Sequence, residues 1–298
     1  MDVKLEGLNY LNLKYPLLAK AAFRDQESEL TDYIARYLEQ VLMVSGVKIE
    51  TAMDAYAKTC FEFMKLQNKF LTTKRYAASS QVSLDYSLYS KKNLMEPYLL
   101  GLLSTYLYWE NHAKIFDFYC KDFCPFAKEI MNADVLEIGT GHGLFASYIL
   151  ENNWNTSYLG IDISKSSLEF SGNLFKVMFP QLQQIKFSQK DATSPNFDLE
   201  KKYDLAICCE VLEHVENPEK LLQNIKQSLC ENGRVFVTTV INLEAIDHIY
   251  LFKNSIEIRN LFKKSGFAVV EERVYKLPNS TSELEQSNYA AIISPISN

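Results

Sequence analysis

The sequence predicts an α/β fold in which an all-helical N-terminal region precedes a doubly wound parallel sheet. Up to about residue 130 there is almost no strand signal, and apolar residues such as Ile34 and Leu38 recur at helical spacing. From Asp134 onward, short β-rich runs alternate with helical runs, which specifies a parallel sheet covered by helices on both faces. We therefore expect a helical domain at residues 1–130 and a sheet domain at residues 131–298.

Strands and helices can be placed along the second region from these runs. Strands are expected at residues 134–138, 158–162, 185–191, 203–210, 234–240, 267–275 and 289–296. Helices are expected at residues 144–152, 165–178, 218–229 and 255–266. Asn217 can cap the third of these helices, and Pro218 suits its first position because a first helical residue needs no N–H partner.

Composition and charge argue against several classes of function. The 298 residues are 47% hydrophobic and 23% charged, which is typical of a soluble globular protein. The net charge is −6, and the basic residues are scattered, so nucleic-acid binding is not expected. The longest apolar run, Tyr98–Trp109, has only 12 residues, which favours a buried helix over a membrane span.

The N-terminus and the cysteines favour a cytoplasmic location. The opening residues MDVKLEGLNY lack the basic flank and apolar stretch of a secretory signal. The six cysteines show neither the paired spacing of a zinc ribbon nor the density of a disulfide scaffold. We expect reduced and mostly buried thiols.

The residues that follow the strands carry the chemistry, because ligands of a doubly wound sheet bind beyond the carboxyl ends of its strands. After the first strand, EIGTGHG places Gly139, Gly141 and Gly143 where the backbone must turn sharply and approach a ligand. Asp162 follows the second strand, with Ile163 beside it, and can accept both hydroxyls of a ribose. After the third strand, Asp191 can accept an exocyclic amine of adenine, with the backbone of Ala192 adjacent.

The details of this turn favour S-adenosylmethionine (SAM) over a nicotinamide cofactor. The pattern is G-x-G-x-G instead of G-x-G-x-x-G, and Glu137 lies in the strand just before it. A pyrophosphate requires donors and positive charge, whereas the amino acid end of SAM carries an ammonium and a sulfonium. Glu137 therefore suits SAM.

Several motifs in the right order resemble the class I SAM-dependent methyltransferases. These are VLEIGTGHGLFA, LGIDIS, QKDAT and YDLAICCEVLEHVENPEKLLQNIKQSLCENGRVFVTT. The stretch EVLEHVENPEKLL is similar to ubiquinone-type O-methyltransferases and to many methyltransferases of natural-product pathways. The resemblance covers roughly residues 131–298. It implies a Rossmann-like seven-stranded sheet that ends in an antiparallel hairpin of the last two predicted strands.

An N-terminal helical lid is common in this superfamily, and the first 130 residues are expected to form one. A lid excludes water and aligns the nucleophile with the methyl group and the sulfur. Aromatic faces can also attract the sulfonium. The candidate lining residues are Tyr86, Tyr89, Tyr106, Trp109, Asn111 and His112.

A cluster of acids and histidines follows the fourth strand. If the chain turns helical there, Glu210, Glu213 and His214 fall on one face, and Asp247 and His248 follow the next strand toward the same cleft. Carboxylates and imidazoles together suit a divalent cation. The pattern E-x-x-E-H with a later D-H resembles the metal site of plant-type small-RNA 2′-O-methyltransferases. That resemblance implies Glu210, Glu213, His214 and His248 as ligands.

The same cluster also has an interpretation without a metal. EVLEHV is frequent in methyltransferases that use no cation, where the glutamate caps the next helix and the histidine lines the pocket or acts as a base. In that case His214 is the general base, because an imidazole titrates near neutral pH. Both interpretations stay open at this point.

The sequence as a whole predicts a cytoplasmic SAM-dependent methyltransferase that acts on a small molecule, at oxygen, in a biosynthetic or natural-product pathway. The expected catalytic residues are His214, Glu210 and His248, and Glu210 also borders the cofactor. Neither a nucleic-acid nor a membrane partner is expected, and a homodimer is compatible with the sequence. The alternatives are C-methylation of an enolisable acid, an intramolecular reaction of SAM, and a SAM-binding module without catalysis.

Overall fold

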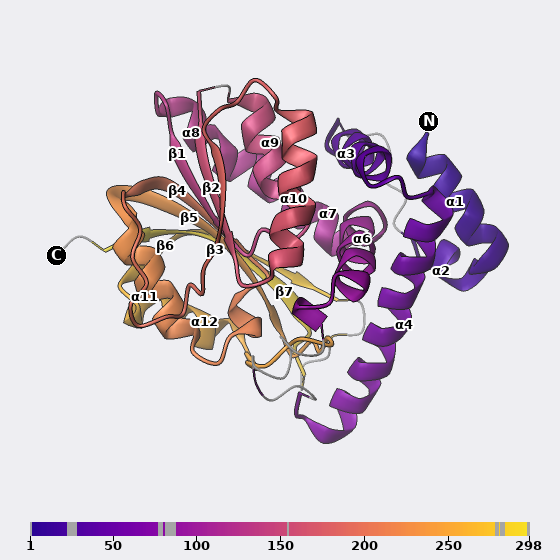
Figure 1. The fold of residues 1–298 in the computed structure, drawn as a ribbon. Helices are drawn as coiled ribbons and strands as arrows, with labels where there is room; N and C mark the ends of the chain where they lie inside the picture. The colour runs from indigo at the N-terminus through magenta and orange to yellow at the C-terminus, as the bar shows by residue number, and fades with distance from the viewer. Residues whose placement is uncertain are drawn as a thin grey trace.

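The computed structural model describes residues 2–22, 29–76, 80, 88–153, 155–277, 280 and 284–296. The described part of the N-terminal region is helical, as the sequence predicts (Figure 1). Its elements are α1 (Val3–Lys14), α2 (Pro16–Ala21), α3 (Glu29–Ser45), α4 (Ile49–Thr73), α6 (Lys92–Tyr108), α7 (Glu110–Phe118), the π-helical turn η2 (Tyr119–Phe123) and α8 (Cys124–Glu129).

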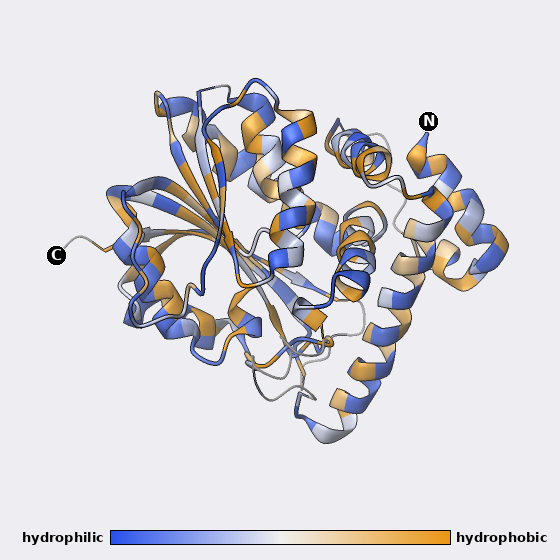
Figure 2. Cartoon of the chain, viewed as in Figure 1, coloured by the Kyte–Doolittle hydropathy of each residue, from blue (hydrophilic) through white to orange (hydrophobic). Residues whose placement is uncertain are grey.

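The helices form where apolar residues recur every three or four positions. In α4 the buried residues include Ala52, Tyr56 and Cys60, and Figure 2 shows α4 banded in hydrophilic and hydrophobic colours along its length. One polar residue, Gln67, is also on the buried face of α4. The apolar run that begins at Tyr98 forms the buried second half of α6, as expected. Among the described residues, no helix combines the length and apolarity needed to cross a bilayer.

The sheet has seven strands in the order β3-β2-β1-β4-β5-β7-β6. The strands are β1 (Asp134–Ile138), β2 (Ser157–Asp162), β3 (Ile185–Gln189), β4 (Tyr203–Cys209), β5 (Leu229–Ile241), β6 (Phe267–Lys276) and β7 (Ser287–Pro295). The first five pair in parallel, whereas β7 runs antiparallel to both β5 and β6. The expected doubly wound sheet with a terminal antiparallel pair is confirmed.

Four helices connect the strands and cover the two faces of the sheet. They are α9 (Leu144–Asn152), α10 (Lys165–Met178), α11 (Pro218–Ser228) and α12 (Ser255–Lys264). Alternate residues of β4 face opposite sides, so Leu205 and Ile207 join a core with the N-terminal helices, α9 and α10, and Ala206 and Cys208 join a core with α11 and α12. Figure 1 shows α11 and α12 on the side of the sheet away from α3 and α6.

β5 begins five residues before its predicted start at Arg234. Tyr203 pairs with Leu229, but Leu205 pairs with Arg234, so the register shifts between these pairs and β5 takes up the extra residues. Such an irregularity inserts residues into one strand without ending the sheet. The sequence pattern marks only the regular part of β5.

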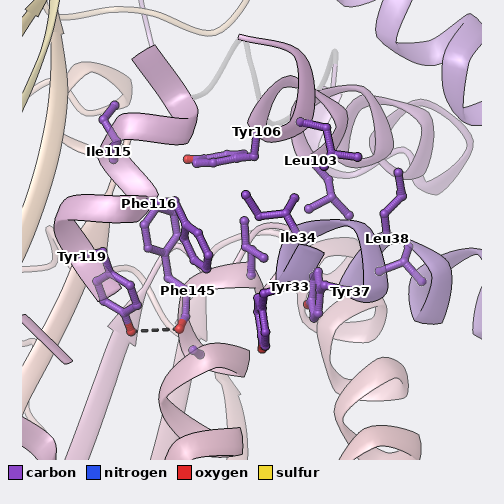
Figure 3. Packing of buried hydrophobic residues seen from close by; sticks show 14 of the residues in the cluster. Tyr33, Ile34, Tyr37, Leu38, Leu103, Tyr106, Ile115, Phe116, Tyr119 and Phe145 are labelled. Carbon is purple, nitrogen blue, oxygen red and sulfur yellow. Dashed lines mark hydrogen bonds between the residues drawn. The ribbon is translucent and has the colours of Figure 1, made fainter. Parts of the chain in front are cut away.

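The N-terminal helices and the sheet share one core. Figure 3 shows aromatic rings from α3, α6, α7, η2 and α9 packed together, and the hydroxyl of Tyr119 donates to the carbonyl of Phe145 at 2.8 Å. Tyr119 also packs edge-on against Phe236 of β5, with ring centroids 5.1 Å apart. The predicted boundary at residues 130 and 131 falls in the connection between α8 and β1. Residues from both sides of this connection pack in the same core. The division into two domains therefore stays a prediction.

Candidate active site

A cleft lies at the carboxyl ends of the parallel strands, between the sheet and helices α4, α6 and α7. It is lined by all the residues that the sequence analysis assigned to a cofactor, which are Glu137, Gly139, Gly141, Gly143, Asp162, Ile163, Asp191, Ala192 and Glu210. The lining also includes His214, Asp247 and His248. The structure therefore brings the strand-end residues together at the edge of the sheet where ligands of this architecture bind.

The glycine-rich turn after β1 has a backbone that other residues rarely adopt. Gly139, Gly141 and Gly143 have φ of 74°, 45° and 76°. A Cβ on Gly139 would lie 2.7 Å from Cγ2 of Val211, which is closer than carbon atoms approach. Glycine here lets the backbone face the cleft without a side chain between them.

Two carboxylates follow β2 and β3. Asp162 accepts the backbone N–H of Ser164 at 2.8 Å, and burial raises its pKa to about 6. Asp191 accepts both the N–H and the hydroxyl of Thr193, at 2.8 and 2.6 Å, through the same oxygen, Oδ1. Both side chains line the cleft and have oxygens that can accept further hydrogen bonds.

Glu137 at the end of β1 is buried, and its Oε2 accepts the hydroxyl of Tyr158 at 2.5 Å. Burial raises the pKa of Glu137 to about 8, although the hydrogen bond from Tyr158 opposes this. The carboxyl is therefore mostly protonated at neutral pH in the ligand-free protein. A cation bound beside it would favour the ionised form.

The chain does not turn regularly helical at Glu210, so Glu210, Glu213 and His214 do not lie on one helical face. Glu210 has a left-handed φ of 53°, and only a 3₁₀ turn, η3 (Leu212–His214), follows. This backbone costs roughly 1–2 kcal/mol in a residue with a side chain. It lets the Glu210 N–H donate to the hydroxyl of Thr238 at 2.9 Å, and that hydroxyl donates back to Glu210 Oε1 at 2.7 Å.

Glu213 is fully buried at 0% exposure. Its Oε2 accepts the hydroxyl of Thr239 at 2.7 Å, whereas Oε1 has no hydrogen-bond partner among the described residues. Burial raises the pKa of Glu213 to about 7. Burial and the charge of Glu213 also raise the pKa of Glu210. A buried carboxylate oxygen without a donor is costly unless a ligand supplies the missing interaction.

Two imidazoles lie beside Glu213, and backbone carbonyls fix their tautomers. His214 Nδ1 is 2.9 Å from the carbonyl oxygen of Asp247, and His248 Nδ1 is 2.7 Å from that of Leu243. A carbonyl oxygen only accepts, so each Nδ1 carries a proton, and a ring with no second proton presents a free Nε2. Burial lowers the pKa of His248 to about 4, so that ring is neutral at pH 7.

Glu213, His214 and His248 each offer a ligand atom within 4.8 Å of the others, and among the described residues this is the group of three that could hold a metal ion. Glu210, the fourth predicted ligand, does not belong to it. Its Oε1 accepts the Thr238 hydroxyl instead. Asp247 also lies outside the group, since its carboxylate accepts the hydroxyl of Tyr98 at 2.9 Å and that of Tyr89 at 3.3 Å.

The predicted aromatic lining faces the cleft in part. Tyr89, Tyr106, Trp109, Asn111 and His112 are all lining residues, whereas Tyr86 lies outside the described residues. The ring of His112 packs against those of Tyr106 and Trp109, each with centroids 5.0 Å apart, and its Nδ1 is 2.6 Å from the hydroxyl of Thr105. Burial lowers the pKa of His112 to about 3, so this wall is uncharged.

Three site residues were not predicted from the sequence. Thr238 and Thr239 hold the two glutamates, and their position at the carboxyl end of β5 is a signal that the strand-end rule could have used. Tyr98, which holds Asp247, is inside the apolar run of α6 and gives no such signal.

Replacing Glu137 by Gln is expected to make the ligand-free protein more stable at pH 9 and to change little at pH 5. Because burial raises the pKa of Glu137 from 4.5 to about 8, the folded state holds a proton in this range that the unfolded state has released, and stability falls as the pH rises. Gln cannot ionise and still accepts the Tyr158 hydroxyl. Urea unfolding at several pH values measures this, with exposed Glu231→Gln as the control. Parallel profiles for parent and Glu137→Gln would contradict it.

Comparison with known proteins identifies relatives for part of the chain. The chain is 30% identical over 112 residues to the ubiquinone biosynthesis O-methyltransferase of Rickettsia typhi (strain ATCC VR-144 / Wilmington), covering 38% of this chain and 43% of that protein. The chain thus spans less than half the length of this curated relative.

Two solved structures share the fold over most of the chain. The mitomycin 7-O-methyltransferase MmcR has a TM-score of 0.56 at 11% identity, covering 90% of this chain and 76% of that one. The O-methyltransferase NcsB1 from neocarzinostatin biosynthesis, solved with S-adenosyl-L-homocysteine and 1,4-dihydroxy-2-naphthoic acid, has a TM-score of 0.55 at 12% identity, covering 81% and 70%. At these identities the likeness shows the fold alone.

A model of the family described as a methyltransferase domain matches residues 111–272, which is more than half of the chain. The match begins inside α7 and ends inside β6. It therefore contains the glycine-rich turn, the strand-end acids and the histidine cluster. The chain belongs to this methyltransferase family, with the fold of the class I SAM-dependent methyltransferases.

Proposed function

We propose that the protein is a SAM-dependent methyltransferase that methylates an oxygen of a small molecule. The observation that carries this proposal is the position of two imidazoles, each held through Nδ1 by a backbone carbonyl, beside buried Glu213, in the cleft that also contains the glycine-rich turn and Asp162. A cofactor site and a group that can take a proton from a hydroxyl therefore share one cavity.

The strand-end residues fit SAM. We propose that the three glycines of the turn let the backbone approach the cofactor and that Asp162 binds the ribose hydroxyls. Asp191 and Ala192 bind the adenine, and Glu137 binds the ammonium end. Ile163 and Glu210 border the cofactor. The fit rests on charge and shape. Among the described residues that line the cleft there is one lysine, Lys190, no arginine and six acids, which complements the positive charge of SAM.

The reaction needs a proton acceptor near the methyl group. When bound, SAM supplies a methyl group on a sulfonium, which an acceptor oxygen can displace with the carbon–sulfur bond electrons going to sulfur. We assign the hydroxyl proton to Nε2 of His214, whose Nδ1–H the Asp247 carbonyl holds at 2.9 Å. His248 and Glu213 face the same point and stabilise the positive charge that His214 then carries. The helical region over the cleft excludes water.

Two features of the structure suit a divalent cation beside these groups. Glu213 Oε1 is buried without a donor among the described residues, and both imidazoles donate Nδ1–H to backbone carbonyls, which is how metal-bound histidines are usually held. We propose Glu213, His214 and His248 as the ligands, with Glu210 in support. A cation there would lower the pKa of a bound acceptor hydroxyl.

The charges of the cleft also favour an acceptor without a negative charge. The six acids that line it are Glu62, Glu137, Asp162, Asp191, Glu210 and Asp247, and Lys190 lies next to Asp191 at the adenine end. A phosphate or carboxylate on the acceptor would meet no arginine or lysine among the described residues near His214. We therefore propose a neutral small-molecule acceptor in a biosynthetic or natural-product pathway, with two adjacent oxygens where the cation is bound. The six free thiols suit a reducing cytoplasm.

Asp162→Ala is expected to weaken SAM binding by about 10- to 100-fold, because the ribose hydroxyls lose a charged acceptor worth roughly 1.5–3 kcal/mol. Isothermal titration with SAM measures this, and Asp198→Ala, on an exposed side chain outside the cleft lining, is the matched control. Equal affinities for the parent and Asp162→Ala would exclude the cofactor assignment. In a separate incubation with SAM, analysed by chromatography, S-adenosylhomocysteine formed only with an added acceptor distinguishes methyl transfer from an intramolecular reaction and from binding alone.

Mn²⁺ is expected to bind the parent with one ion per chain, and His214→Ala or His248→Ala is expected to weaken binding by more than about tenfold, since each removes a ligand. Titration followed by electron paramagnetic resonance measures the free ion. His112→Asn, at a buried imidazole outside the group, is the control. No binding by the parent, or equal losses in all three variants, would leave His214 as a base without a metal.

A further inference from the structure

The loop of residues 242–251, which we call the Asp247 loop, supplies the carbonyls that hold both imidazoles. It follows β5 and carries Leu243, Asp247 and His248. The backbone N–H groups of Ile249 and Tyr250 both donate to the carbonyl of Glu213, at 2.7 and 2.9 Å. The loop is thus bound to the turn that carries two of the proposed ligands.

The helical region holds this loop at two points far apart in sequence from it. Gln67 of α4 donates from Nε2 to the carbonyl of Asn242 at 3.0 Å and accepts the N–H of Glu244 at its Oε1 at 2.8 Å. Tyr98 of α6 donates to the carboxylate of Asp247 at 2.9 Å. Each contact lies beside one of the two carbonyls that fix an imidazole.

The contact of Gln67 is the more specific of the two. Its amide binds the backbone on both sides of Leu243, and the carbonyl of Leu243 accepts His248 Nδ1–H at 2.7 Å. Gln67 is 8% exposed, on the buried face of a helix that is otherwise apolar there. Burying an amide side chain costs free energy unless its N–H and C=O groups are hydrogen-bonded. Both groups of Gln67 are bonded to the backbone of the Asp247 loop, so the contact holds that backbone in place.

We infer that Gln67 is a positioning residue of the active site: it fixes the Leu243 carbonyl, and through it the tautomer and orientation of His248. This inference rests on the proposed function of the cleft. Gln67 touches neither the cofactor site nor the proposed ligands, and it acts only through the backbone. The helical region therefore builds part of the active site in addition to covering it.

Removing the Gln67 amide should affect the imidazole of His248 and leave that of His214 unchanged. In Gln67→Met, which keeps the length of the side chain, the backbone on both sides of Leu243 loses its hydrogen bonds to α4. Asn242 keeps its side-chain bonds to the carbonyls of Lys253 and Glu285, so we expect the Leu243 carbonyl to shift relative to His248 Nδ1–H while the loop stays folded. His214 keeps its own carbonyl, because Asp247 is still held by Tyr98. The long-range ¹H–¹⁵N spectrum of the imidazoles reports the tautomer of each ring, and the chain has only four histidines.

The experiment compares the parent, Gln67→Met and Asn68→Ala, which removes an exposed amide from the next position of α4. We expect the Nδ1–H pattern for His214 and His248 in the parent and in Asn68→Ala, and a changed pattern for His248 alone in Gln67→Met. Mn²⁺ affinity should fall about tenfold in Gln67→Met, as for other residues that orient metal ligands, and SAM affinity should change little. The melting temperature should fall, because two buried backbone groups lose the amide that pairs with them.

A His248 spectrum that is the same in Gln67→Met as in the parent would overturn the inference, as would equal changes in both imidazoles. These results are separate from a failure of the proposed function. If the parent binds no SAM, the function is wrong, but the spectra still show whether Gln67 sets His248. If the parent binds SAM and the spectra are unchanged, the function stands without this role for Gln67.

Discussion

The site depends on two hydrogen bonds, from His214 and His248 Nδ1–H to the carbonyls of Asp247 and Leu243. Because both acceptors are backbone carbonyls, neither neutral ring can move its proton from Nδ1 to Nε2 without losing its bond. The Asp247 loop must therefore be rigid, and the structure holds it through the Glu213 carbonyl on one side and through Gln67 and Tyr98 on the other. This explains why a helical region that shares the core of the sheet is part of the active site.

The cleft and the wall behind it contain carboxyl groups that no lysine or arginine of the described residues pairs with, which a protein selected for stability alone would avoid. Burial raises the pKa of Glu137, Asp162 and Glu213 to about 8, 6 and 7, so ionising any of them costs stability in the ligand-free protein. A cationic cofactor, and a cation beside Glu213, would offset that cost. The cost of ionising these carboxyl groups in the ligand-free protein is then recovered when a cationic ligand binds, so the electrostatics of the cleft favour cationic ligands.

The sheet and its strand-end residues could be predicted from the sequence because their signals are local. Alternating runs specify the strands, and the glycine turn and Asp162 sit at fixed offsets from them. The backbone at Glu210 could not be predicted, since its left-handed φ depends on Thr238, 28 residues away. Gln67 was missed for the same reason. Its two partners lie about 175 residues downstream, and a single polar residue on a buried helix face gives no hint of what it contacts.

A crystal structure of the protein grown with S-adenosylhomocysteine and Mn²⁺, with anomalous data collected at the manganese edge, tests the central claim most directly. The account predicts ribose hydroxyls on Asp162, the thioether sulfur facing His214, and an anomalous peak bounded by Glu213 Oε1 and the Nε2 atoms of His214 and His248. S-adenosylhomocysteine bound with its sulfur away from this cluster would contradict the assignment of the active site. A correctly placed ligand without a peak would remove the cation and retain His214 as the base.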